Sequence, residues 1–273
     1  MAQEISLTSA MRANLLSLQS TVNLLNRTQD RLSSGKKVNS ALDNPTNFFA
    51  AKAHQNRAND IAARKDSMGE AIQTVKSASS GIDSISTLIE SARGIAQAAL
   101  STSDAAQRTQ YVSQYNAVID QIDTLAGDSG YRGTNLLVGN TLSVKFNEDG
   151  ASSLSIAGFS ATKAGLAITA GAAWTADAAG TTAINSALTE LAGASSTLRV
   201  NASSLSSSLS IVQTRADWAD QMIATLRAGA SALTDADMNE EGANMLMLQT
   251  RQSLGTTALS LSAQNAQSVL RLF

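Results

Sequence analysis

Residues 184–233, INSALTELAGASSTLRVNASSLSSSLSIVQTRADWADQMIATLRAGASAL, carry the most regular hydrophobic pattern of the chain. Apolar or small residues recur there at alternating steps of four and three, at Ile184, Leu188, Leu191, Ser195, Leu198, Ala202, Leu205, Leu209, Val212, Ala216, Ala219, Ile223, Leu226, Ala230 and Leu233. This is the heptad spacing of a helix that buries one stripe against other helices. At about 1.5 Å per residue, such a helix would be roughly 75 Å long. The segment therefore predicts a helical rod.

Helical period and capping signals predict further helices on both sides of this segment. Asn44 as N-cap and Pro45 at the first helical position predict a helix over about 45–100. Asp104 predicts the start of a second helix, over about 104–126. The periodic segment quoted above predicts a third helix, over about 181–233. Thr234, with Asp237 three residues later, predicts that a helix restarts after a break.

The middle of the chain differs in kind, since nine of its 17 glycines fall between residues 127 and 180. Leu142, Val144 and Phe146 alternate with polar residues, as do Leu154 and Ile156, and residues 147–150 offer a turn between them. Alternation on both sides of a turn predicts a β-hairpin, within a β region of about 140–175. For residues 159–174 the sequence leaves open a second short hairpin or an irregular turn.

Both ends of the chain are almost free of charge. From Ile5 to Asn26 the only charged residue is Arg12, and from Gly242 to Phe273 the only ones are Arg251 and Arg271. A solvated helix normally has a charged outer face, so these ends are typical of helices that pack against more protein. The predicted assembly seam consists of Met11, Leu15, Leu18, Val22, Leu25, Leu32, Met247, Leu254, Leu259, Leu261, Val269 and Phe273.

The two ends must meet for either to bury its stripe, and a chain that runs out along a rod, turns and returns meets that condition. Aromatic residues make up only 4% of the chain, so the core must consist mainly of Leu, Ile, Val and Ala. We therefore expect a mainly α fold, a long antiparallel helical rod or coiled coil with a small central β-hairpin region.

Composition argues against several classes of function. The net charge of −2 gives no electrostatic reason to expect nucleic acid, and the absence of cysteine excludes disulfides and thiolate chemistry. His54 is the only histidine, so no second one completes a metal site or a nucleophile–base pair. We expect no enzyme activity and no cofactor. No apolar run approaches the ~18 residues of a membrane span, and the first residues lack the pattern of a cleavable secretory signal.

A serine cluster lies on the long returning helix. Because Leu205 and Leu209 occupy the buried heptad line, Ser203, Ser204, Ser206, Ser207 and Ser210 are expected to face outward. Two interpretations remain open, a solvated helix face and a surface that carries O-linked glycans.

Three stretches of the sequence resemble bacterial flagellin. They are RLSSGKKVNSA at residues 31–41, GYRGTNLL at 130–137 and AQNAQSVLR at 263–271. The first is similar to the family's N-terminal signature, the second to the turn before its β region, and the third to its C-terminal signature. The match spans essentially the whole chain and is most similar to the short alphaproteobacterial type, which lacks large variable outer domains.

This resemblance implies a structural subunit of the flagellar filament that self-assembles into a helical tube for swimming motility. On that analogy, residues 1–43 and 235–273 pair as an inner coiled-coil core, and residues 44–234 form an outer rod domain. The implied partners are further copies or related flagellins, the flagellar type III export apparatus and a chaperone, and the filament cap and hook-junction proteins. Neither nucleic acid nor membrane is expected as a partner. The implied location is the extracellular filament, reached without signal cleavage.

Two alternatives stay open at this point. A hook–filament junction protein would share the design of the termini. A cytoplasmic, chemoreceptor-like signalling coiled coil is compatible with long helices rich in Ser and Ala, although the central β insert and the lack of a membrane span argue against it.

Overall fold

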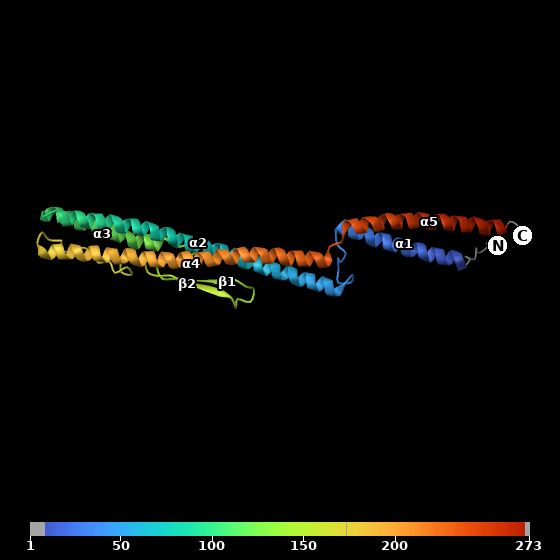
Figure 1. Cartoon of the computed structure of the whole chain (residues 1–273), viewed down its shortest axis with the longest axis horizontal. Helices are drawn as coiled ribbons and strands as arrows, with labels where there is room; N and C mark the ends of the chain where they lie inside the picture. Colours follow the sequence, from blue (N-terminus) through green and yellow to red (C-terminus); the bar gives the residue numbers. More distant parts are fainter. Residues whose placement is uncertain (1–8, 173, 271–273) are drawn as a thin grey trace. The chain divides into compact units, whose positions relative to one another are not determined.

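The computed structural model describes residues 9–172 and 174–270. Over these residues the chain forms five helices and one two-stranded antiparallel sheet (Figure 1). In chain order the elements are α1 (Ser9–Ser34), α2 (Pro45–Ser101), α3 (Ala105–Asp128), β1 (Thr141–Lys145), β2 (Ser153–Ala157), α4 (Ala178–Thr234) and α5 (Met238–Leu270). The predicted fold class, mainly helical with a small central hairpin, is confirmed.

The chain divides into two compact units. The first comprises Met1–Asn56 with Thr225–Phe273, and the second comprises Arg57–Ala224. The first unit therefore contains α1, α5 and the adjoining ends of α2 and α4. The second contains the rest of α2 and α4 together with α3 and the hairpin.

Local capping explains where the helices begin. Asn44 Oδ1 accepts a hydrogen bond from the Asn47 backbone N–H at 3.1 Å, and Asp104 Oδ1 accepts one from Ala106 at 2.8 Å. The predicted break and restart near Thr234 are also present, since α4 ends at Thr234 and α5 begins at Met238, but Asp237 and not Thr234 caps the new helix. Thr234 donates its hydroxyl to the Ala230 carbonyl instead, so it ends one helix and does not begin the next.

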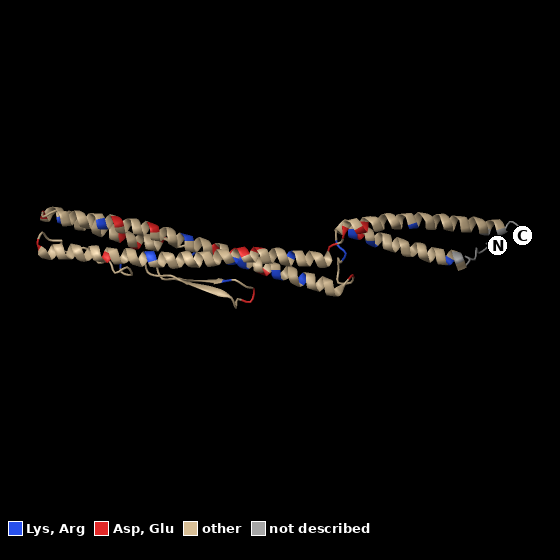
Figure 2. Ribbon diagram, viewed as in Figure 1, with Lys and Arg blue, Asp and Glu red and all other residues tan. Residues whose placement is uncertain are grey.

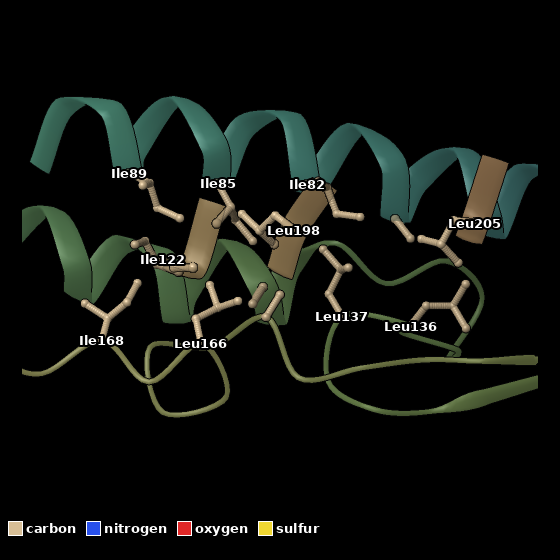
Figure 3. Close-up of a cluster of buried hydrophobic side chains, with 14 of the residues drawn as sticks. Ile82, Ile85, Ile89, Ile122, Leu136, Leu137, Leu166, Ile168, Leu198 and Leu205 are labelled. Carbon is tan, nitrogen blue, oxygen red and sulfur yellow. The ribbon is translucent and has the colours of Figure 1, made fainter. Parts of the chain in front are cut away.

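One continuous hydrophobic cluster holds the second unit together (Figure 3). In Figure 3, Ile85 and Ile89 of α2 project toward the side where α3 and its Ile122 lie, and Ile82 projects to the same side above Leu137. Further members come from α4, from the segment after α3 and from residues 166–168, among them Leu136, Leu137, Leu166, Ile168, Leu198 and Leu205. Branched aliphatic side chains dominate the cluster, as the low aromatic content required.

The hairpin covers one part of this cluster. Its register pairs Leu142 with Ile156 and Val144 with Leu154, and both Val144 and Ile156 are buried. Gly150 in the turn has a φ of 70°, a conformation that glycine adopts without a Cβ penalty. Beyond the strands, residues 159–172 and 174 form no strand, so the irregular turn and not the second hairpin is correct.

A buried arginine connects the loop after α2 to the segment before α4. Arg108 is 5% exposed, and its Nε donates to the Thr102 carbonyl at 2.8 Å. Its Nη1 donates to the Thr175 carbonyl and lies 3.4 Å from the Thr181 hydroxyl oxygen. Backbone and hydroxyl oxygens thus satisfy this guanidinium in place of a carboxylate.

Tyr115 is fully buried at the centre of α3. Its ring lies 5.0 Å from that of Trp174, and its hydroxyl donates to the Thr169 carbonyl at 3.4 Å. Burial, with a smaller effect from the negative charge of Glu190, raises the pKa of Tyr115 to about 12.

We expect this tyrosine to make folding sensitive to alkali. Because its folded pKa lies above the unfolded value of about 10, its contribution to stability is complete below pH 10 and is lost as the pH rises toward 12. Replacing Tyr115 with Phe should flatten the fall in unfolding free energy across this range, measured by urea unfolding at successive pH values. Tyr111→Phe, at a half-buried position of the same helix, is the control. Identical pH profiles for wild type and Tyr115→Phe would contradict this role.

Candidate assembly interface

The first unit is built on a pair of helices, α1 and α5, that lie side by side (Figure 1). Arg31 near the end of α1 contacts Glu241 near the start of α5, and Leu18 approaches Gly255 further along both helices. Because one residue number falls as the other rises, the two helices run antiparallel.

The seam between the two helices contains many polar and small residues. On α1 the buried or half-buried positions are Met11, Leu18, Thr21, Val22, Leu25, Thr28, Arg31 and Leu32. On α5 they include Glu241, Met245, Leu248, Gln252, Gly255, Leu259 and Ser262, which step by four and three. The pair thus has heptad geometry, although about half of its seam is not hydrophobic.

Gly255 allows the closest approach within this seam. A Cβ atom built at this position would lie 2.7 Å from Leu18 Cδ1, nearer than side-chain carbons pack. The absence of a side chain at Gly255 therefore leaves the space that Leu18 occupies, and larger residues would push the helices apart.

The loop after α1 fixes one end of the pair. Gly35, with a φ of 70°, ends α1 and accepts a hydrogen bond from the Ala236 N–H at 2.9 Å. The Lys37 N–H donates to the Thr234 carbonyl at 2.7 Å. Arg31 Nη1 and Glu241 Oε1 lie 2.7 Å apart just beyond these backbone bonds. The residues around Gly35 and Thr234 thus bring the first turn of α5 against the last turn of α1.

Large apolar side chains remain on the outside of the same helix pair. Leu15, Leu16, Leu24, Leu246, Met247, Leu254 and Leu261 are between 41% and 68% exposed. Met247, Leu254 and Leu261 lie seven residues apart, so they form a line on one face of α5, which we call the outer line. A half-exposed Leu or Met side chain lacks about 1 kcal/mol of the free energy that full burial would give. Burying all seven in a contact with other protein would therefore favour association substantially.

The structure divides the predicted seam between these two surfaces. Met11, Leu18, Val22, Leu25, Leu32 and Leu259 lie buried or half-buried in the first unit. Leu15, Met247, Leu254 and Leu261 are exposed. Val269 belongs to α5, but its side chain lies outside the described structure, as does the whole of Phe273.

Sequence reasoning missed the polar members of the seam. Thr21 and Thr28 are 4% and 6% exposed, yet a search for apolar residues passes over both. The Thr21 hydroxyl donates to the Ser17 carbonyl one turn earlier at 2.9 Å, which removes most of the cost of burying it. Glu241 is buried too, although an acidic residue in the first turn of a helix is ordinarily explained by the positive end of the helix dipole.

Charges are sparse along α1 and α5 except where α1 ends and α5 begins (Figure 2). In the described parts of the chain, no group of His, Asp or Glu side chains is arranged to hold a metal ion, and no helix has the length and hydropathy for a membrane crossing. The exposed Leu and Met side chains of α1 and α5 are what suits this helix pair to packing against protein.

In the second unit, Ser203, Ser204, Ser206, Ser207 and Ser210 are all exposed on α4. Both interpretations of this cluster, a solvated face and a glycosylated one, remain predictions.

Comparisons with known proteins agree with this architecture at both ends. Residues 5–141 match the bacterial flagellin N-terminal helical region, and residues 181–273 match the bacterial flagellin C-terminal helical region. The chain belongs to the bacterial flagellin family. It is accordingly a structural subunit of the flagellar filament, in a family of structural proteins.

Relatives of similar length support the assignment. The flagellin FljM of Caulobacter vibrioides is 32% identical over 95% of this chain and 94% of its own length. The flagellin of Brucella melitensis is 28% identical over 100% and 99%, respectively. The crystal structure of Bacillus cereus flagellin covers 56% of this chain with 18% identity and a TM-score of 0.46, a likeness too distant to add to the assignment. The resemblance to short flagellins is thereby confirmed.

We expect the α1–α5 pair to be sensitive to the volume of residue 255. Gly255→Val places a branched side chain where Leu18 packs and should raise the critical concentration for polymerisation about tenfold or more. The control is Gly242→Val on the same helix, because a Cβ there has nothing within 4 Å. Sedimentation of polymer from a dilution series measures both variants, and equal critical concentrations would contradict the tight seam.

Proposed function

We propose that the exposed apolar faces of α1 and α5 pack against neighbouring copies of the chain and so build the core of the filament. The observation that carries this proposal is the outer line, in which Met247, Leu254 and Leu261 are 55%, 66% and 58% exposed on one helix face. A monomer gains nothing from such a line in water, whereas a polymer buries it in every subunit.

The helix pair leaves apolar residues on both of its helices, so each copy has more than one surface to offer. Leu15, Leu16 and Leu24 lie on α1, and the outer line lies on α5. Contacts between two different surfaces do not close into a dimer, and when repeated they generate an open helical polymer. This supports the assignment of residues 1–43 and 235–273 to the inner core and of 44–234 to the surrounding rod domain.

The proposal extends to the route by which the chain reaches the filament. We infer export through the flagellar type III apparatus with a chaperone, followed by assembly at the extracellular tip with cap and hook-junction proteins. The sequence supports passage as an unfolded chain, since it has no cysteine and a single proline. Such a chain forms no crosslinks in transit and has only one peptide bond prone to slow isomerisation.

We expect Leu254→Asp to abolish polymerisation while leaving the subunit folded. Residue 254 is 66% exposed, so a carboxylate there is tolerated in the monomer, but packing of the outer line would bury it without a partner. Electron microscopy and sedimentation measure the polymer, and circular dichroism checks the helix content of the subunit.

The matched control is Ser260→Asp, which places the same charge at an exposed position on a different face of α5. It should polymerise much like the wild type. Normal filaments from Leu254→Asp would refute the proposed role of the outer line, and wild-type assemblies that remain short caps would favour a hook–filament junction protein instead.

A further inference from the structure

A polar cavity of about 280 Å³ lies within the first unit, where the loop after α1, the start of α2 and the start of α5 come together. Arg31, Asp43, Asn44, Asp237, Glu240 and Glu241 are among the residues that line it. With Lys37, the whole lining holds four carboxylates and two cationic side chains, so the cavity has an excess of negative charge and favours a positively charged occupant.

One buried carboxylate oxygen in this cavity has no partner. The Glu241 side chain is 8% exposed, and its Oε1 accepts a hydrogen bond from Arg31 Nη1 at 2.7 Å. Its Oε2 is buried without a hydrogen bond. Leaving a charged acceptor buried and unsatisfied is costly, so Oε2 calls for a hydrogen-bond donor.

Glu240 is the carboxylate of the cavity that accepts no hydrogen bond from a described residue. Asp43 Oδ2 accepts hydrogen bonds from the Asn39 and Ser40 backbone, and Asp237 Oδ1 accepts them from Asn239 and Glu240. Glu240, in contrast, is exposed, and its carboxylate has no partner among the described residues. Glu240 thus offers an accessible carboxylate to a guanidinium, and the charge of Glu241, which lines the same cavity, adds to the attraction.

Arg251 on α5 is an exposed cationic side chain that lacks an acidic partner among the described residues. It follows Met247 by four residues and precedes Leu254 by three, so it shares the face of the outer line. When that face packs against another copy, the guanidinium loses water and requires new acceptors, of which a carboxylate binds it most strongly.

The Arg251 of the same chain is poorly placed to fill the cavity. Ten residues separate it from Glu241, which is about 15 Å along a helix axis. In the described part of the first unit, the acidic residues are Asp30, Asp43, Asp235, Asp237, Glu240 and Glu241, all near the junction of α1 and α5 (Figure 2). If the first unit of another copy supplies an acidic partner to Arg251, that partner lies in the junction region.

We propose that this cavity is a socket for the Arg251 guanidinium of a neighbouring subunit, which binds the exposed carboxylate of Glu240 and is attracted by the negative charge of Glu241 behind it. The proposal rests on the filament function above and adds a specific ionic contact to it. It sets the register between copies, because apolar packing alone tolerates sliding whereas a charge pair has one position.

Crosslinking tests the contact directly, since the wild-type chain has no cysteine. Glu240→Cys subunits and Arg251→Cys subunits of different tag lengths are copolymerised and treated with a short bismaleimide. The mixed dimer should form in the polymer and be at least about tenfold scarcer when Ser260→Cys replaces Arg251→Cys. Equal yields for the two pairs would overturn the socket.

Charge exchange tests the energetics independently. Arg251→Glu and Glu240→Arg should each raise the critical concentration about tenfold, and the double variant should recover most of the loss. Failure of both the crosslink and the recovery, in a wild-type protein that forms filaments, would overturn the socket and leave the proposed function intact. A wild-type protein that forms no filaments would overturn the proposed function itself, and the socket with it.

Discussion

The antiparallel contact between α1 and α5 is the constraint on which the terminal architecture depends. Its seam accommodates Thr21, Thr28, Gly255 and the Arg31–Glu241 pair, so it consumes little of the hydrophobic surface that the two helices carry. The Leu and Met side chains left outside are held in fixed lines by the pairing. Such a helix pair is folded in the single chain, but its exposed apolar side chains can be buried only by contact with other molecules.

The second unit, in contrast, buries its apolar side chains within the single chain. Its cluster of Ile, Leu, Val and Ala side chains closes around α2, α3, α4 and the hairpin within one chain. Arg108 and Tyr115 find hydrogen-bond partners inside the unit, so its buried polar groups do not depend on assembly. The chain therefore combines one unit that is stable by itself with one that has exposed apolar surfaces. This arrangement suits a polymer subunit that must stay folded before it is incorporated.

The sequence predicted the second unit better than the first. Ile184, Leu191, Leu198, Leu205 and Val212 are buried as their seven-residue spacing required, because every partner is supplied by the same chain. On α1 the predicted positions Leu18, Val22 and Leu25 are half-buried, but the predicted Leu15 is exposed, and the most buried places next to them are taken by Thr21 and Thr28. Hydrophobic periodicity identifies a helix face that is buried against protein, but it does not say whether that protein is the same chain or another copy. The cavity at the α1–α5 junction was also invisible to sequence reasoning, since its residues come from three separate segments.

Methionine oxidation measures the proposed division between inner and outer surfaces most directly. Met247 is 55% exposed, whereas Met68 is fully buried in the second unit and serves as an internal reference. Peroxide should convert Met247 to the sulfoxide rapidly in dilute subunits and much more slowly in filaments, while Met68 stays slow in both. Equal rates of Met247 oxidation in subunits and filaments would show that the outer line stays in water after assembly, and would contradict the burial of this face between copies.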